Sequence, residues 1–418
     1  MNVNGNGIER DRRKGKEIVM AFPRSASPRS AFLGSSSPRS WTRRSFVQTL
    51  SCLGALGGLS PVEAWASAAG YGDRELLPPP RFGFVSSSED AVHVFAIGRK
   101  GSWTKIQTVS SLSPASLVLS PDQRFLYVAN AVESFEHLPA GSVEAYAVDA
   151  NTGRLSLLNQ RGLALSATMP KHLAISPAGR QLAVAVSGGA AYNLLPLHED
   201  GSIGRVTASL KQVGRGFDPA TQSTAFPHSV LFQDDATLLA TDMGCDRVSS
   251  FSLAQDGSLT LQKHQGVSPG SGPGPIVGHP GGQASFFAGS LDPVISSLYY
   301  GEGSASPVSQ KFRLSFASSG ISSLAMHPSG RLLFAGNAEG VWIVGIDGSC
   351  AIEATSGQVE RMDGVTALAA SADGTHLVAG ARDGSLARFD IDRARGRILS
   401  SRELASVVHP TAIALKHN

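Results

Sequence analysis

One histidine of the chain lies in a setting that suits acid–base chemistry. His228 belongs to the segment Phe226-Pro227-His228-Ser229-Val230, and two carboxylates, Asp242 and Asp246, follow it in the next polar segment. An imidazole with an ordinary pKa near 6.5 can accept a proton from water at neutral pH, and a neighbouring carboxylate can hold the ring. We therefore treat His228, Asp242 and Asp246 as candidate catalytic residues. The alternative is that all three only brace loops, since a buried imidazole readily satisfies backbone groups.

Four further polar side chains are candidates for binding a ligand. His172 and Lys171 lie in Met169-Pro170-Lys171-His172, Arg247 ends the segment that begins at Asp242, and Asn130 ends an apolar run. The cations could face a developing negative charge. The His and Asp residues lack the clustered spacing of metal ligands, so we predict no metal and no cofactor.

These residues lie before or after the copies of a repeated phrase, or at the end of one, and the phrase predicts a turn followed by a strand. Its clearest copy, Ser120-Pro121-Asp122-Gln123-Arg124, leads into the apolar run Phe125 to Ala129. Pro sets φ for the turn, and the short apolar run suits a buried strand. Six copies begin 44 to 56 residues apart, at Ser120, Ser176, Phe232, His279, His327 and Ser371. A period near fifty with several strands per unit is typical of a β-propeller. His279 and His327 occupy the turn position of Ser120, so we interpret them as turn residues.

The two ends of the repeat region predict a seventh blade. Arg81 to Val85 resembles a second strand without a first strand before it, whereas Pro410 to Leu415 resembles a first strand with nothing after it. Pairing these ends would close the ring and remove exposed sheet edges. We therefore predict an all-β fold, a seven-bladed β-propeller of four-stranded blades over residues 81–418.

The first 80 residues differ in kind from the repeats. Residues 1–41 are basic and lack apolar periodicity, so we predict a disordered leader. Residues 42–68 combine Arg43-Arg44, a modest apolar run and the small-residue stretch Ala64 to Ala68, which together predict a twin-arginine export signal. Cleavage after Ala66 or Ala68, and a start at Met1 or Met20, remain open. Residues 69–80 are a linker, and we expect a periplasmic or secreted protein.

The charge balance and the short apolar stretches argue against nucleic acids and membranes as partners. Residues 1–68 hold ten Lys or Arg and four Asp or Glu, so residues 69–418 carry a formal charge of −3 although the whole chain carries +3. A mildly acidic mature protein does not favour nucleic-acid binding. No apolar stretch reaches the length of a membrane span. We expect a monomer that binds a small molecule and is not inserted in a membrane after signal removal.

Several segments together resemble a known family. They are Phe125 to Asn130, Gly141 to Val143 with Asp149 to Leu155, Pro170-Lys171-His172, Pro227 to Val230 and Asp242 to Arg247. These segments are similar to the seven-bladed propeller lactonases, which include 6-phosphogluconolactonases and carboxymuconate cyclases. The resemblance spans roughly residues 80 to 415. It implies a small lactone or sugar-acid lactone as substrate, no cofactor, and His228 as the general base.

The chain departs from the family at four site positions. The family's working set is one His, two Arg and one Glu, and only the His, matching His228, remains. Gly274 stands in one Arg position, Ala338 in the other, Ser290 in the Glu position, and Pro275 replaces a further His. Lactone opening needs a base and a donor or cation that faces the oxyanion, and arginine clamps favour phosphorylated substrates. The substitutions disfavour phosphogluconolactone as the substrate.

Two functions remain open from the sequence. The first is an exported lactonase or related sugar-acid hydrolase with an altered site. The second is a propeller that has lost its chemistry and binds a ligand or a protein at the channel mouth. A generic protein-interaction propeller draws support only from Ala379 to Ser385, which resembles a WD-type blade, and the missing Trp-Asp pairs argue against it.

Overall fold

The computed structural model describes residues 78–301, 304–305, 310–314, 317–392 and 397–417, without the side chains of 301, 304–305 and 354–359. The predicted leader, the export signal and residues 69–77 of the linker lie outside the described residues. Within the described part of the chain, antiparallel strands form seven sheets, and no helix is long and apolar enough to span a membrane.

Each sheet is one blade, and its strands follow the sequence order from the inner strand outward. The first blade is the exception, because its inner strand is the last strand of the chain. The sheets are β29-β1-β2-β3, β4 to β7, β8 to β11, β12 to β15, β16 to β18 with β19 and β20 both paired to β18, β21 to β24, and β25 to β28. The strands are β1 (Phe82–Ser87), β2 (Ala91–Ile97), β3 (Trp103–Ser110), β4 (Pro114–Leu119), β5 (Phe125–Asn130), β6 (Ser142–Val148), β7 (Leu155–Gly162), β8 (Thr168–Ile175), β9 (Gln181–Gly188), β10 (Ala191–Pro196), β11 (Ala208–Lys211), β12 (Pro227–Phe232), β13 (Thr237–Asp242), β14 (Arg247–Leu253), β15 (Leu259–Gly266), β16 (Pro273–Gly278), β17 (Ala284–Gly289), β18 (Val294–Gly301), β19 (Ser304–Ala305), β20 (Gln310–Arg313), β21 (Ser323–Met326), β22 (Leu332–Gly336), β23 (Gly340–Ile346), β24 (Ile352–Arg361), β25 (Val365–Ala370), β26 (His376–Ala381), β27 (Ser385–Asp392), β28 (Arg397–Ser406) and β29 (Pro410–Lys416). A short 3₁₀ helix, η1 (Met243–Cys245), connects β13 to β14.

The inner strands form a closed circle. In order, β29, β4, β8, β12, β16, β21 and β25 each contact the next, and β25 contacts β29 again. The predicted seven-bladed propeller is therefore confirmed.

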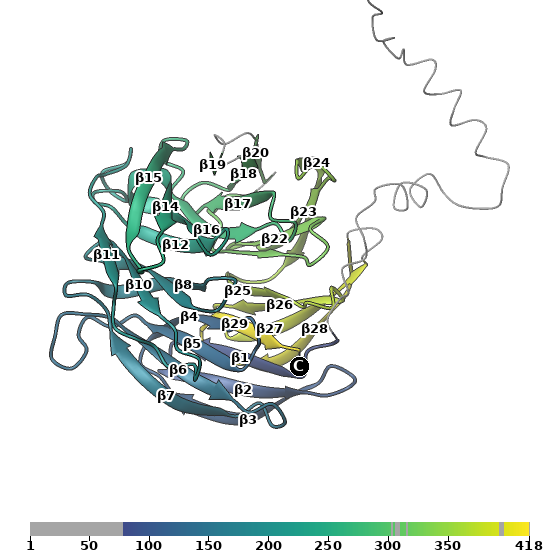
Figure 1. The fold of residues 1–418 in the computed structure, drawn as a ribbon. Coiled ribbons are helices and arrows are strands. Elements are labelled where there is room, and N and C mark those ends of the chain that lie inside the picture. Colours follow the sequence, from purple (N-terminus) through teal and green to yellow (C-terminus); the bar gives the residue numbers. More distant parts are fainter. Residues whose placement is uncertain (1–77, 302–303, 306–309, 315–316, 393–396, 418) are drawn as a thin grey trace, which may run out of the picture. The chain divides into compact units, whose positions relative to one another are not determined.

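The ring closes through the two ends of the repeat region. β29 runs antiparallel to β1, with Phe82 opposite Lys416 and Phe84 opposite Ala414, and the two strands lie side by side in Figure 1. Arg81 N also donates to Lys416 O at 2.8 Å. The predicted pairing of the C-terminal strand with the N-terminal three is confirmed, and it gives β1 a partner strand on both sides.

The repeated phrase forms the turn between the first and second strand in six of the seven blades. Ser120 O accepts a hydrogen bond from Gln123 N, and Ser120 Oγ accepts one from Phe125 N at 3.0 Å. His279 and His327 take the same place, because their carbonyls accept from Gly282 N and Gly330 N. Their rings also reach the turn of the next blade, where His327 Nε2 lies 2.9 Å from Gly374 O. The interpretation of both histidines as turn residues is therefore correct.

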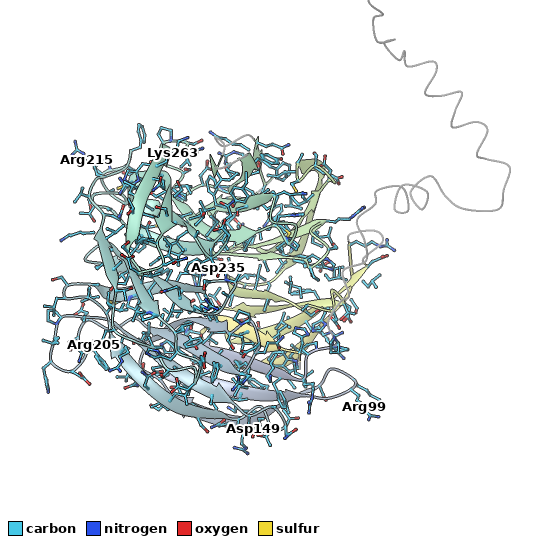
Figure 2. The ribbon with its side chains drawn as sticks, viewed as in Figure 1. Arg99, Asp149, Arg205, Arg215, Asp235 and Lys263 are labelled. Carbon is cyan, nitrogen blue, oxygen red and sulfur yellow. The ribbon has the colours of Figure 1, made fainter. Side chains whose placement is uncertain are left out.

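Apolar side chains of the inner and middle strands pack between neighbouring blades. One such core joins Tyr127 and Val143 of the second blade to Leu182 and Ile203 of the third. Figure 2 shows the charged side chains of Arg99, Asp149 and Arg205 at the outer margin of the propeller.

Candidate active site in the central channel

A cavity of about 230 Å³ lies where the seven inner strands meet. All seven strands, or the residue directly before them, contribute to its wall. The ionisable groups among the lining residues are Lys171, His172 and His228, and the hydroxyl groups are those of Ser116, Ser229, Ser322, Ser323, Thr366 and Thr411.

One sequence position recurs in every inner strand, and we name it the ring position. In β4, β12, β16, β25 and β29 the ring position is the second residue of the strand. In β8 it is the fourth residue, and for β21 it is the residue just before the strand. From β4 to β29, in chain order, the ring position holds Ala115, Lys171, His228, Gly274, Ser322, Thr366 and Thr411. In six of the seven strands the register with the second strand shifts here. A bulge re-aims a side chain, and every occupant except Gly274 lines the cavity.

Three ring-position hydroxyls hold neighbouring blades together. Ser322 Oγ donates to Val365 O at 2.6 Å, Thr366 Oγ1 to Pro410 O at 2.5 Å, and Thr411 Oγ1 to Pro114 O at 2.5 Å. Each bond runs from one inner strand to the first residue of the next. The ring position is therefore structural in these three blades.

Two neighbouring blades carry ionisable groups at the same position instead. Lys171 of β8 and His228 of β12 occupy equivalent places, and His172 follows Lys171. His228 Nδ1 lies 3.0 Å from Ser229 Oγ, and Val230 N donates to His172 Nδ1 at 3.4 Å. With Nδ1 as acceptor, the neutral His172 ring carries its proton on Nε2. The structure thus brings three of the predicted site residues to one wall of the channel.

The surroundings disfavour positive charge on both rings. Burial, then the nearby Lys171 charge and then His172, lower the pKa of His228 to about 3. Burial and Lys171 lower the pKa of His172 to about 4. Lys171 itself is exposed to channel water, yet the enclosing protein lowers its pKa too. An ordinary imidazole pKa near 6.5 was expected for His228, and the structure corrects this expectation: both rings are neutral at pH 7.

The coupling between Lys171 and the two rings gives a testable prediction. A Lys171→Met variant removes a positive charge, so protonation of His228 and His172 becomes easier and the pKa of each ring rises. NMR titration of the ring protons measures this shift directly. Lys263→Met, on the outer strand β15, is the matched control and should leave both values unchanged. Equal titration curves in wild type and Lys171→Met would show that the lysine does not act on the rings.

Asp242 has partners other than His228. Its Oδ1 accepts from Phe226 N at 2.8 Å and Gly244 N at 3.1 Å, and its Oδ2 lies 3.0 Å from Arg247 Nη2. Arg247 also donates to Gln212 Oε1. Asp242 is fully buried, and the 15% exposed Arg247 side chain is committed to it. We predicted that Asp242 holds the His228 ring, but among the described residues no hydrogen bond joins these two side chains. Arg247 does not line the cavity.

Asp246 joins two loops through its carboxylate. Its carboxylate accepts from Gly270 N at 2.7 Å, Gly272 N at 2.8 Å and Phe217 N at 3.3 Å. Gln222 Nε2 adds a fourth bond at 2.7 Å. These donors come from residues 217–222 and 270–272, so Asp246 fixes both loops to η1. Asp246, like Asp242, has backbone groups as its main partners.

Asn130 lies in the second blade, away from the cavity wall. Its Nδ2 donates to Ser111 Oγ and Leu112 O, both at 2.9 Å, and the residue is fully buried. Its Oδ1 is buried without a hydrogen-bond partner. Asn130 therefore ties the second blade to the segment that follows the first blade.

Of the four substituted family positions, Gly274 lies beside His228. A Cβ atom at Gly274 would lie 3.5 Å from His228 Cε1 and would overlap Ser290 Oγ. Pro275 lines the cavity. Ala338 lies in another loop, where its N–H meets Ser319 Oγ at 3.2 Å. Gly274 and Ser290 therefore form a matched pair of small residues next to the histidine.

The sequence reasoning did not identify the channel hydroxyls of Ser322, Thr366 and Thr411. A signal for them was available, because a Pro begins the inner-strand motif at positions 114, 170, 227, 273 and 410, and the next residue is the ring position. Aligning the inner strands by this Pro places Lys171 and His228 in one column with Thr411. Among the described residues, no group of three His, Cys, Asp or Glu is arranged to hold a metal.

Comparison with known proteins supports this architecture. The family description "Lactonase, 7-bladed beta-propeller" matches residues 82–411. A 6-phosphogluconolactonase of Bacillus subtilis is 22% identical over 297 residues, which cover 66% of this chain and 81% of that protein. A 6-phosphogluconolactonase of Erwinia tasmaniensis is 27% identical over 212 residues, and the match spans 50% of this chain but only 58% of that protein. The solved structure of a periplasmic gluconolactonase of Pseudomonas aeruginosa superposes with a TM-score of 0.72, covering 80% of this chain and 98% of that one at 22% identity.

Proposed function

Because the chain belongs to the family of seven-bladed β-propeller lactonases, we propose that it hydrolyses a lactone in the central channel with His228 as general base. The observation that carries the proposal is the pairing of Lys171 and His228 at equivalent ring positions of adjacent blades. A cation and a neutral imidazole side by side are the two groups that lactone opening requires.

The reaction assigns one role to each group. Water attacks the lactone carbonyl, and His228 takes the proton from that water. The Lys171 ammonium faces the oxyanion that forms on the carbonyl oxygen. The ring C–O bond then breaks, and the proton passes to the leaving alkoxide, so that lactone and water give a hydroxy acid. His172 helps to position the substrate, while Asp242 and Asp246 shape the mouth by holding its loops.

A panel of lactones tests the proposal. The purified protein is expected to open D-glucono-1,5-lactone or another δ-lactone faster than the spontaneous reaction, measured by acid release in weak buffer. The relatives' names point to 6-phosphogluconolactone, but the only cationic side chain among the described cavity-lining residues is Lys171. We therefore expect unphosphorylated lactones to react at least as well as the phosphorylated one. A wild-type protein that opens no member of the panel contradicts the proposal.

A propeller that only binds a ligand is the second candidate. It is favoured by one observation, that Asp242 and Asp246 both have structural partners and neither supports His228. It predicts saturable binding of a sugar-acid lactone without turnover.

Export belongs to the proposal as well. It is supported by the sequence pattern around Arg43 and Arg44 and by the periplasmic relative named above. An Arg43→Lys, Arg44→Lys double variant is expected to remain in the cytoplasm, because the twin-arginine pathway reads the arginine pair. Cell fractionation and immunoblotting measure the distribution, with Arg39→Lys as the control. A normal periplasmic level of the double variant would contradict export by this route.

A further inference from the structure

The channel cavity holds a positive charge that its own wall does not balance. Lys171 is the only cationic side chain among the described residues that line the cavity, and none of those lining residues is an Asp or a Glu. Within the described part of the chain no ion pair involves the Lys171 ammonium, and the enclosing protein alone lowers the pKa of this group. An enclosed charge is costly unless it is paired. The cavity therefore favours an anionic ligand.

His172 adds a hydrogen-bond donor beside this charge. Its Nδ1 accepts from Val230 N at 3.4 Å, so the neutral ring carries its proton on Nε2. His172 lines the cavity next to Lys171, and among the described residues no acceptor takes the Nε2 proton. An ammonium and a ring N–H side by side can donate to the two oxygens of one carboxylate, and hydrogen bonds to a charged group are the strong ones.

The opposite side of the same cavity carries hydroxyl groups that have already used their protons. Ser322 Oγ donates to Val365 O, and Thr366 Oγ1 donates to Pro410 O. A hydroxyl that has donated its only proton keeps its lone pairs, so it can still accept from a ligand. Thr366 belongs to β25, which lies three places from both β8 and β12 in the circle of inner strands, the largest separation that seven positions allow. The cavity thus has a donor side and an acceptor side.

We propose that the channel binds an open-chain polyhydroxy acid, with its carboxylate on Lys171 and His172 and its hydroxyl groups donating to Ser322 and Thr366. This inference rests on the proposed function, because ring opening converts the lactone carbonyl that faces Lys171 into this carboxylate. The lactone is neutral and the acid is an anion, so the wall that assists the reaction binds the product more tightly than the substrate. The acid is therefore a competitive inhibitor, and sustained turnover requires its removal.

Titration calorimetry of the purified protein with three ligands tests the inference: D-gluconate, D-glucitol, which lacks the carboxylate, and hexanoate, which lacks the hydroxyl groups. D-Gluconate is expected to bind at least about tenfold more tightly than either, because each of the others uses only one side of the cavity. Lys171→Met should weaken D-gluconate binding at least about tenfold, whereas Lys263→Met, which removes the same charge from the outer strand β15, should not change it. Added D-gluconate should also shift the NMR signals of the His172 and His228 rings.

The outcomes separate the inference from the proposed function. If a lactone is opened but D-gluconate neither binds nor inhibits, the acid site is wrong and the lactonase stands. If no lactone is opened but D-gluconate binds and Lys171→Met loses this binding, the acid site stands without catalysis. D-Glucitol or hexanoate binding as tightly as D-gluconate, or unchanged D-gluconate binding by Lys171→Met, overturns the inference. Neither turnover nor D-gluconate binding would overturn both.

Discussion

A chain that ends at Val408 is expected to lose its cooperative fold. The truncation removes β29, and with it the strand paired along all of β1 and the buried side chains of Ile413 and Leu415. Burial of two such side chains is worth about 1.5–3 kcal/mol each, and every ladder hydrogen bond adds about 0.5–1.5 kcal/mol. The loss approaches the roughly 5–15 kcal/mol by which a whole domain is stable. Near-UV circular dichroism and a thermal melt measure the effect.

A circular permutant provides the control for this truncation. Because Arg81 N contacts Lys416 O, residues 409–417 can be placed ahead of Arg81 through a short turn. The permutant keeps every pairing of β29 and should melt close to the full-length protein. A truncated chain that melts at the normal temperature would show that the closure does not stabilise the ring.

A His228→Gln variant is expected to lower kcat on an active lactone about 100-fold. General-base catalysis contributes about 10²–10⁴, and a pKa of about 3 makes His228 a weak base, so we expect the lower end of that range. Gln retains the size and hydrogen-bonding capacity of the ring, and the melting temperature should stay nearly constant. The same pKa predicts that protonation of His228 does not reduce kcat/KM between pH 7 and pH 5, because a lowered pKa moves this protonation to more acid conditions.

The control is His264→Gln on the outer strand β15, where His264 Nδ1 contacts Ser249 Oγ at 2.8 Å. It should leave kcat unchanged. If His228→Gln instead lowers the melting temperature while activity per folded molecule is unchanged, His228 braces its loop and the base must be sought elsewhere. A fall of kcat/KM with an apparent pKa near 6.5 would also contradict the neutral, buried ring.

The architecture of this protein could be read from local patterns. The turn phrase of Ser120 to Arg124 and its repeats predict strands and blades, since turn chemistry and short apolar runs act over a few residues. The incomplete units at Arg81 to Val85 and Pro410 to Leu415 predict the closure in the same way. His172, His228 and Lys171 line one cavity, because a repeat maps equivalent positions to equivalent places in space.

Only the tertiary structure decided the partners and the charge state of these groups. Asp242 and Asp246 looked like supports for His228. Asp242 instead binds Arg247, and Asp246 binds backbone groups such as those of Gly270 and Gly272, which only folding brings to it. The low pKa of His228 likewise follows from burial and from Lys171 in the neighbouring blade, more than fifty residues earlier in the chain. Local sequence determines strands and turns because their energies are local. Hydrogen bonds and desolvation depend on what surrounds a group in three dimensions, so they are decided by the closed ring.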